Sequence, residues 1–497
     1  MPGAFRPGAL GAFARPFVPG CALLASACVL PDYVSSSSGS GGSGGGSPVC
    51  ETALTKNIGT SGTEEQANDL VSGPDDSTIV IGDFSGTIEY VAGQSLPSLG
   101  TDAFVMRVAK DGTPEWVVQL GGNGDQHASA IARTADGSFI VTGWFGSEIQ
   151  GQGDPIAASG PVDSFVARVE ADGTLAWLET FGGPNEDYAV DAMATTGGVV
   201  IAGHFRDTMT IEGEVLPDQT LSPPDTLFDL FVLKVGLDGT FTERAAFTKQ
   251  GEAYASELAA RPDGTFYLAG TYKGTMPFGG TDAGPDSTGY DMFVAKLSST
   301  FSPVYSRRYG AGGDDSGGNI VATDDGYVVS GVSVSSTDPI DFGGAEVTPT
   351  DLVYSYFLAR LDDGNAGAWA RLLETATPGV DPKPAPTSLA LRGSELVVAL
   401  SVNAPIVVGS ETLPDGTDDS ADVVVLGMDL DTQSFVGRAS WHAPAGQRLE
   451  EVVSDGCGLA FAGWFNGTLE LPDAPKVEAT GKNIVVGRLS ETALFPP

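Results

Sequence analysis

Residues 163–205 read DSFVARVEADGTLAWLETFGGPNEDYAVDAMATTGGVVIAGHF, and this stretch decides the fold. It contains four short apolar runs, which are separated by Asp172-Gly173, by a loop that begins with Gly182-Gly183, and by Gly197-Gly198. Such pairs between apolar runs favour β-hairpin turns, because glycine accepts the positive φ that these turns need. The stretch therefore predicts two hairpins, or four strands.

The same unit recurs seven times along the chain, and three markers identify it. The first marker is Asp-x-Phe-Val-x-Arg/Lys-Val/Leu, with spacings of 61 to 67 residues between copies centred on Phe104, Phe165, Phe231, Phe293, Phe357, Val424 and Val485. The second marker is an apolar run that ends in Gly-x-aromatic, with its glycine at Gly82, Gly143, Gly203, Gly270 and Gly463, a partial copy at Gly331, and Leu400 in the remaining copy. The third marker is Gly-Gly followed by acidic residues, as in 121–131 and 182–193.

The repeats predict an all-β fold, a seven-bladed β-propeller of four-stranded blades over residues 50–497. The FVxRV and VVIAG segments are apolar on both faces, which is typical of strands that are covered on both sides. Six or eight blades, a sandwich and a β-helix are the alternatives. Residues 64–84 carry the second half of a unit and residues 483–489 the first half. We therefore expect half a blade from each end to join in one blade that closes the ring.

The DAFVMRV and GG-acidic stretches resemble the repeats of exported bacterial seven-bladed β-propeller proteins. The resemblance covers about residues 50–497 and is strongest in the second and third units. It implies the propeller fold and an extracytoplasmic setting. It implies no catalytic residues.

The N-terminus is typical of a secretory signal peptide over residues 1–27. Arg6 and Arg15 precede a short apolar segment, which ends in small residues before Cys28. This ending resembles the lipobox of bacterial lipoproteins, which implies a lipid on Cys28 and, since Val29 follows, the outer membrane or cell surface. Residues 28–49 would form a flexible Ser/Gly-rich tether. The alternative is an ordinary signal peptide in which Cys28 is incidental.

Composition excludes several classes of function. The 497 residues carry a formal net charge of −39, with 64 acidic and 25 basic side chains. A nucleic-acid binder needs a basic surface, and adsorption to anionic lipid needs one too. No apolar run of 18 residues is present that could span a bilayer. We therefore expect a monomer that meets the membrane only through its N-terminal anchor and binds no nucleic acid.

Cys50 and Cys457 remain after the signal peptide and the lipid site are set aside. In an exported, oxidising compartment they are a candidate disulfide that would reinforce ring closure. Two unpaired buried thiols are the alternative.

The sequence contains no convincing catalytic or metal site. Asp315-Ser316-Gly317-Gly318 resembles the nucleophile loop of chymotrypsin-like proteases, but it occupies the third repeat marker. The histidines, His127, His204 and His442, lie in different units, and His204 is interpreted as a blade-surface residue. The recurring aspartates at the start of the FVxRV strands are interpreted as turn caps, and they are Asp102, Asp163, Asp229, Asp291 and Asp422. We predict no cofactor, with a structural calcium ion in the Asp-rich loops as the alternative.

Function is expected in the parts that do not repeat. The irregular connections at 146–162, 206–228, 272–290 and 334–353 would lie on one rim of the disc, where propellers bind ligands. Trp144, Phe145, Trp464 and Phe465 are candidates for an aromatic platform that binds carbohydrate or protein, but for the tryptophans burial in a blade core is the favoured interpretation. The sequence thus favours a binding or scaffold module for a protein or carbohydrate ligand. The rival hypothesis is an exported hydrolase or lyase with its active site at the mouth of the channel.

Overall fold

The computed structural model describes most of the chain from residue 53 to residue 490. Cys28, Cys50, Cys457 and the 35–47 segment lie outside the described residues, so their predicted roles stay predictions. The described parts form no helix that is long and apolar enough to cross a membrane. They comprise residues 53–54, 58, 65–91, 93–216, 227–247, 251–278, 287–334, 337–349, 354–364, 366–373, 385–402, 405–408, 411–413, 422–441, 446–454, 458–469 and 476–490.

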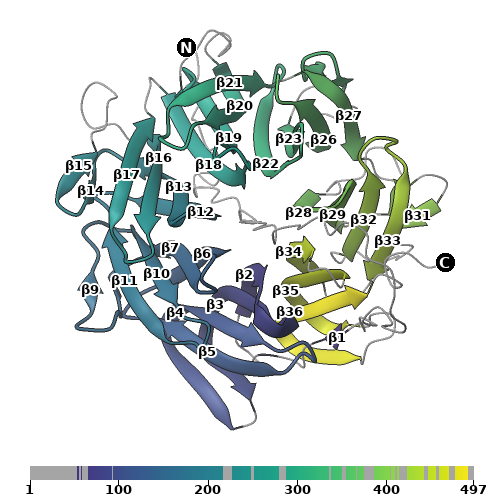
Figure 1. Ribbon diagram of the computed structural model, residues 1–497. Helices are drawn as coiled ribbons and strands as arrows, with labels where there is room; N and C mark the ends of the chain where they lie inside the picture. Colours follow the sequence, from purple (N-terminus) through teal and green to yellow (C-terminus); the bar gives the residue numbers. More distant parts are fainter. Residues whose placement is uncertain are drawn as a thin grey trace, which may run out of the picture.

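Seven four-stranded antiparallel sheets, the blades, are arranged radially around a central axis (Figure 1). This confirms the predicted seven-bladed propeller. Blades 1 to 3 comprise β2 (Glu65–Ser72), β3 (Thr78–Val91), β4 (Gln94–Val108) and β5 (Pro114–Leu120); β6 (Gln126–Arg133), β7 (Phe139–Phe145), β10 (Asp163–Val169) and β11 (Leu175–Phe181); and β12 (Asp187–Thr195), β13 (Gly198–Arg206), β16 (Phe228–Gly236) and β17 (Phe241–Phe247).

The remaining blades follow the same order from the axis outward. Blades 4 to 6 comprise β18 (Gly251–Ala260), β19 (Phe266–Gly274), β20 (Ser287–Leu297) and β21 (Pro303–Tyr309); β22 (Asp314–Ala322), β23 (Gly326–Val334), β26 (Tyr354–Asp362) and β27 (Gly367–Leu373); and β28 (Ala385–Arg392), β29 (Glu395–Val402), β32 (Asp422–Asp429) and β33 (Phe435–Trp441). Blade 7 comprises β34 (Gln447–Ser454), β35 (Gly458–Leu469), β36 (Val477–Ser490) and β1 (Ala53–Leu54). Short hairpins in the connections comprise β8 (Glu148–Ile149), β9 (Ile156–Ala157), β14 (Met209–Ile211), β15 (Glu214–Leu216), β24 (Ile340–Asp341), β25 (Glu346–Val347), β30 (Ile406–Val408) and β31 (Glu411–Leu413).

The two ends of the chain share blade 7, as predicted, but the expected division into two halves is wrong. β1 adds one outer strand to three C-terminal strands, with Ala53 opposite Arg488. Residues 64–84 instead supply β2 and β3, and Phe84 pairs with Asp102 in blade 1. The reason is that each sequence unit, read from its FVxRV strand, begins at the third strand of one blade and ends at the second strand of the next.

The antiparallel order separates the connections onto two faces. The turns between first and second strands and between third and fourth strands lie on one face, which we call the turn face. The connections between second and third strands and the Gly-Gly loops between blades lie on the other, the loop face. The irregular connections therefore share one face, as the repeat pattern predicted.

The phenylalanine of the first marker and the glycine of the second marker occur together because they pack against each other. Gly203 in β13 pairs with Phe231 in β16, and the phenyl ring lies over the glycine. A Cβ atom at Gly203 would lie less than 3.0 Å from this ring and from the backbone oxygen of Tyr188. Glycine is therefore required wherever phenylalanine fills the first marker. In blade 6 Val424 replaces the phenylalanine, and its partner is Leu400.

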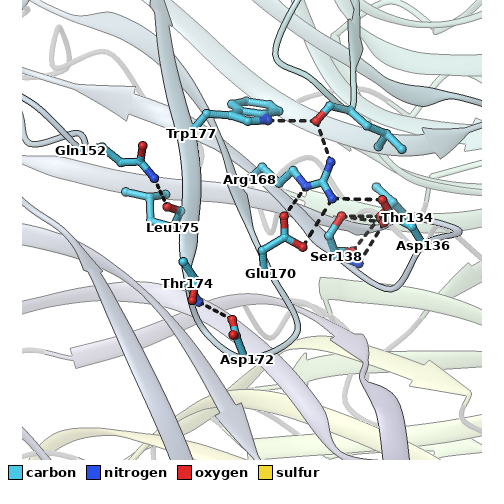
Figure 2. Close-up of polar contacts among 11 residues, drawn as sticks. Thr134, Asp136, Ser138, Gln152, Arg168, Glu170, Asp172, Thr174, Leu175 and Trp177 are labelled. Carbon is cyan, nitrogen blue, oxygen red and sulfur yellow. Dashed lines mark hydrogen bonds and ion pairs between the residues drawn. The ribbon is translucent and has the colours of Figure 1, made fainter.

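The arginine of the FVxRV marker joins each of several blades to the next (Figure 2). In blade 2 the Arg168 guanidinium donates to the carbonyl oxygen of Leu237 in the blade 3 turn, at 2.7 Å. The Trp177 indole Nε1 donates to the same oxygen at 3.0 Å. Asp136 and Glu170 each form an ion pair of 3.0 Å with Arg168. Arg360 and Trp369 repeat this arrangement on the Leu430 oxygen.

Replacing Arg168 with alanine is expected to lower the free energy of unfolding by about 2 kcal/mol, because the guanidinium is mostly buried and its partners would lose their bonds. Arg168→Lys should recover less than half of this loss, since an ammonium group cannot serve the carbonyl and both carboxylates in one plane. Urea unfolding followed by circular dichroism measures both variants. Equal stability of Arg168→Ala and the unmodified protein would contradict the role of this contact.

The acidic residues of the third marker stabilise the Gly-Gly loops. The carboxylate of Asp187 accepts the backbone N–H of Gly183 at 2.6 Å, and Asp315 accepts that of Ala311 at 2.7 Å. Asp315 is therefore a repeat position within β22, as the sequence indicated. Of the aspartates that open the third strands, Asp163 accepts the N–H groups of Ser159 and Gly160, as a turn cap does. Asp291 differs, because the Arg308 side chain holds it at 2.8 Å.

Candidate binding site on the loop face

One position of the repeat differs in chemistry from blade to blade. It is the residue between the glycine and the aromatic of the second marker, and its side chain points toward the next blade. Thus an Asp83 carboxylate oxygen accepts the N–H of Ala128, and the Thr271 hydroxyl accepts that of Gly317. In order from blade 1 to blade 7, these interblade positions are Asp83, Trp144, His204, Thr271, Val332, Ser401 and Trp464.

Aromatic rings from blades 2, 3 and 4 form a continuous set at the loop-face end of the inner strands. His127 stacks on Trp144 with ring centroids 3.9 Å apart, and Trp144 meets Tyr188 edge-on at 5.5 Å. Tyr188 contacts His204 at 5.4 Å, and His204 contacts Tyr254 at 5.1 Å. We call these five residues the aromatic arc. All five are partly exposed, so the arc offers ring surface to a ligand as well as stabilising the blades.

A buried aspartate fixes one end of the arc. The carboxylate of Asp83 contacts His127 Nδ1 at 2.9 Å and accepts the Asn68 side-chain amide at 2.8 Å. Burial is the largest single effect and lowers the pKa of His127, but the charge and hydrogen bond of Asp83, together with the charge of Asp125, outweigh it, so the pKa is raised. The imidazole is therefore protonated more readily than a free histidine and is held in one orientation.

At the other end of the aromatic arc, a carboxylate joins Tyr254 to a further tyrosine, Tyr290. The hydroxyl groups of Tyr254 and Tyr290 donate to the two oxygens of Glu252, each at 2.5 Å. Burial and these bonds to Glu252 raise the pKa of both tyrosines, so both stay protonated at neutral pH. Lys273 Nζ lies 5.3 Å from the centroid of the Tyr290 ring. The end of the arc therefore has fixed donors and acceptors beside the ring surface.

His204 is partly exposed on the loop face, where it also packs between Tyr188 of its own blade and Tyr254 of the next. Burial and the Arg206 charge lower the pKa of His204 to about 3, so the ring is neutral. Its Nδ1 is buried and has no hydrogen-bond partner among the described residues. Within the part of the chain that the structure describes, no three His, Cys, Asp or Glu side chains are grouped as metal ligands.

Polar contacts connect the arc to Trp464 in blade 7. Lys482 Nζ lies 4.8 Å from the centroid of the Trp464 ring and donates to Gln66 Oε1 at 2.7 Å. The Gln66 amide in turn reaches Asp83, which holds His127. Side chains of blades 7, 1, 2, 3 and 4 are thus in contact along the loop face, whereas blades 5 and 6 have Val332 and Ser401 at the interblade position.

Two of the four residues considered for an aromatic platform lie at the surface, and the other two are buried. Trp144 and Trp464 lie on the loop face and are partly exposed. Phe145 and Phe465 are 0% and 1% exposed and belong to the blade cores, so the structure excludes them as platform residues. Successive strand residues point to opposite faces, and the phenylalanine side is the one that packs with the marker glycine.

Sequence reasoning missed the inner-strand half of the arc. His127, Tyr188 and Tyr254 lie in the innermost strands. Each is followed by an alanine, and each lies opposite an interblade position on the neighbouring strand. Their shared ring-Ala dipeptide was the available signal. The sequence interpretation placed ligand contacts in the irregular connections and at the Gly-x-aromatic residues, so the innermost strands were missed.

The innermost strands also contain a set of fully buried carboxylates. Asp69 accepts the N–H of Ile131 at 2.8 Å, Asp191 that of Leu258 at 2.6 Å, and Glu257 that of Ile320 at 2.6 Å. Each bond joins one blade to another around the axis. We therefore interpret this set as structural.

No known family model matches this chain. The regulatory protein FlaEY of Caulobacter vibrioides is 25% identical over 232 residues, which is 43% of this chain and 24% of that protein. This chain therefore aligns with about a quarter of that relative's length.

Solved structures resemble the chain at the level of fold alone. A protein of unknown function from Dyadobacter fermentans has a TM-score of 0.37 at 11% identity, covering 88% of this chain and 98% of its own. Quinohemoprotein alcohol dehydrogenase from Comamonas testosteroni has a TM-score of 0.38 at 9% identity, covering 89% and 78%. An apocarotenoid oxygenase of Synechocystis has a TM-score of 0.31 at 10% identity, covering 78% and 88%. Likenesses this distant carry no functional argument.

Proposed function

We propose that this propeller is a binding module whose loop face binds an uncharged glycan. The observation that carries the proposal is the aromatic arc, because five partly exposed rings from three consecutive blades meet there, and the described parts of the other blades hold no comparable set. The C–H faces of a sugar ring pack on aromatic rings, and its hydroxyl groups need fixed donors and acceptors nearby. Glu252 and the hydroxyl groups of Tyr254 and Tyr290 supply polar groups at one end of the arc, and the buried Asp83 orients the His127 ring at the other.

The charge of the protein narrows the ligand class. A formal net charge of −39 repels polyanions such as acidic polysaccharides and nucleic acids. An uncharged glycan experiences no such repulsion. The same charge favours a soluble disc that does not self-associate, in keeping with a monomer.

The proposed setting is the bacterial cell envelope, with the propeller attached through a lipid on Cys28. The support is the leader, the cysteine and the Ser/Gly-rich tether that follows it. Labelling cells with a fatty-acid analogue tests this setting: the label should be lost in Cys28→Ser. Label that persists in Cys28→Ser would contradict the anchor.

Trp144→Ala is expected to weaken glycan binding by at least about tenfold, because Trp144 contacts both His127 and Tyr188 and supplies the largest ring of the arc. A glycan array screened with the purified protein identifies the ligand, and isothermal titration measures the affinity of each variant. Trp116→Ala is the matched control, since Trp116 is also partly exposed but packs on Gly173 at the turn face. Equal loss in both variants, or unchanged binding by Trp144→Ala, would contradict the proposal.

A hydrolase or lyase is the second candidate, and the Asp83–His127 contact is the observation that favours it. A carboxylate that orients a histidine is the usual arrangement of a general base. However, Asp83 also accepts the N–H of Ala128 and the Asn68 amide, which gives it a structural role. Incubation of the bound glycan with the protein separates the candidates: cleavage that is lost in His127→Ala would establish an enzyme, and an intact glycan would favour binding alone.

A further inference from the structure

Partly exposed side chains suited to contact with sugars continue beyond the aromatic arc on both sides. In blade 4 the ring of Tyr254 contacts that of Tyr290, with centroids 6.4 Å apart. In blade 7 the ring of Trp464 is partly exposed on the loop face, and Lys482 Nζ lies 4.8 Å from its centroid. The aromatic surface of the loop face therefore reaches from blade 7 to blade 4, with blade 1 between its two parts.

Blade 1 supplies a polar side chain between the two tryptophans of the loop face. Gln66 in β2 is partly exposed, and its Oε1 accepts a hydrogen bond from Lys482 Nζ at 2.7 Å. The Gln66 amide nitrogen donates to the Asp83 carboxylate at 3.4 Å. A side-chain amide has two N–H donors and two acceptor lone pairs, so Gln66 keeps one of each for the hydroxyl groups of a sugar. A sugar over blade 1 would thus meet an amide, and its neighbours along a chain would meet Trp464 and Trp144.

Blades 5 and 6 interrupt this row of contacts. In blade 5, Ser316 of the innermost strand lies opposite Val332 at the interblade position. In blade 6 the interblade position is Ser401. These three side chains have no ring on which a sugar could stack. The row therefore covers five consecutive blades and is open at both ends, which suits the internal part of a long ligand.

The row of contacts is curved, because the innermost strands β34, β2, β6, β12 and β18 lie around the central axis (Figure 1). A chain that touches all five blades must bend in the same sense at each. Glucose chains with α-1,4 or β-1,3 linkages bend in this way, whereas β-1,4-linked glucose forms a straight ribbon. We infer that the loop face binds an internal stretch of a curved, uncharged polysaccharide, which runs from Trp464 over Gln66 and the aromatic arc to Tyr290. The inference rests on the proposed glycan-binding function and names the class of glycan.

Oligosaccharides of two to six glucose units provide the first test, with α-1,4, β-1,3 and β-1,4 linkages compared by isothermal titration. Contacts in adjacent blades that are joined through one ligand reinforce each other, so a six-unit α-1,4 or β-1,3 chain should bind at least about a hundredfold more tightly than the two-unit form. The β-1,4 series should gain less than about tenfold over the same lengths, because a straight chain leaves the curve. An equal gain in the β-1,4 series, affinity that does not rise with length, or no binding in any series would overturn the inference.

Trp464→Ala tests the far end of the row. It should weaken binding of the six-unit chain at least about tenfold and leave binding of the two-unit form unchanged, because a short ligand fits on the aromatic arc alone. Trp116→Ala, on the turn face, is the matched control and should change neither affinity. Circular dichroism confirms that both variants are folded.

The unmodified protein gives a second measurement that does not depend on how Trp464→Ala folds. The chain has six tryptophans, and in a ¹⁵N-tryptophan-labelled sample Trp464→Phe and Trp144→Phe identify the two indole signals of interest. The six-unit chain should shift both signals, and the two-unit form should shift that of Trp144 alone. A Trp464 signal that the six-unit chain leaves in place would overturn the inference.

The outcomes separate this inference from the proposed function. A glycan that binds through Trp144, but whose affinity depends neither on chain length nor on Trp464, would support the proposed function and overturn the inference. If neither the glucose chains nor any glycan of the array binds, both are wrong.

Discussion

Replacing Gly203 with alanine is expected to lower the free energy of unfolding by about 3 kcal/mol. The new Cβ atom would lie less than 3.0 Å from the Phe231 ring and from the Tyr188 backbone oxygen. Both neighbours are fixed: Phe231 is 0% exposed, and the Tyr188 oxygen belongs to the innermost strand of the blade. Urea unfolding, followed by tryptophan fluorescence, measures the change.

Two further variants make this result specific. Gly153→Ala is the control, because its new Cβ would contact nothing within 4 Å, and its stability should change by less than about 0.5 kcal/mol. Phe231→Val in the Gly203→Ala background should restore part of the loss, since blade 6 has Leu400 opposite Val424. Additive losses in the double variant would contradict the account of the paired markers.

The protein is expected to be more stable at pH 5 than at pH 8, by at least about 2 kcal/mol. Burial and the charges of Asp163 and Glu186 raise the pKa of Asp187 to about 8, and burial raises that of Asp191 to about 7. Burial also raises the pKa of Glu257 and Glu451. The unfolded chain releases these protons near pH 4, so between pH 4 and pH 8 the folded state holds protons that the unfolded state has lost. The free energy of unfolding therefore falls as the pH rises through this window.

Two groups oppose this trend, one below about pH 6.5 and the other below about pH 4. The lowered pKa of His204, about 3, makes the folded state less stable as the pH falls from 6.5, because the unfolded histidine binds a proton first. Hydrogen bonds from Thr134 and Ser138 lower the pKa of Asp136 to about 2, which costs stability below pH 4. One histidine opposes several carboxyl groups between pH 4 and pH 6.5, so the free energy of unfolding should reach its maximum near pH 4.

Asp187→Asn tests the assignment to a residue. Asparagine keeps the acceptor for Gly183 without a titrating proton, so the decrease in stability between pH 5 and pH 8 should become smaller. Asp136→Asn is the control, because its carboxyl does not titrate above pH 5, and its pH dependence in this window should match that of the unmodified protein. Unfolding in urea at constant ionic strength gives both curves. A free energy of unfolding that rises from pH 5 to pH 8 would contradict the expectation.

The fold could be predicted because a typical strand is an apolar segment that ends at a recognisable turn. The β10 segment around Phe165 is apolar on both faces, and the Asp172-Gly173 turn fixes where the strand ends. Closure was predicted, but not its division into three strands and one. No local pattern shows that β7 pairs with β10 across the long connection between them, so the boundary of a sequence unit was mistaken for the boundary of a blade.

The site was predicted only in part, because aromatic residues that are adjacent in the sequence lie in different environments, one at the surface and one in the core. Trp144 lies on the loop face and Phe145 in the core, since strand residues alternate between faces. The side that is buried depends on contacts between blades, such as that of Trp144 with Tyr188, which lie far apart in the sequence.

The offset between sequence units and blades affects how such a ring can evolve. One sequence unit encodes the outer half of one sheet and the inner half of the following sheet. A duplication inserts these two halves, and a deletion removes them. The breakpoints lie in the loop-face connections, where length already varies, and each innermost strand keeps the second strand of its own sheet as its partner. Recombination can therefore add or remove a blade while it creates hybrid sheets at the junction, and each hybrid combines an old interblade side chain with a new partner. New ligand contacts on the loop face can arise from such events without any point mutation.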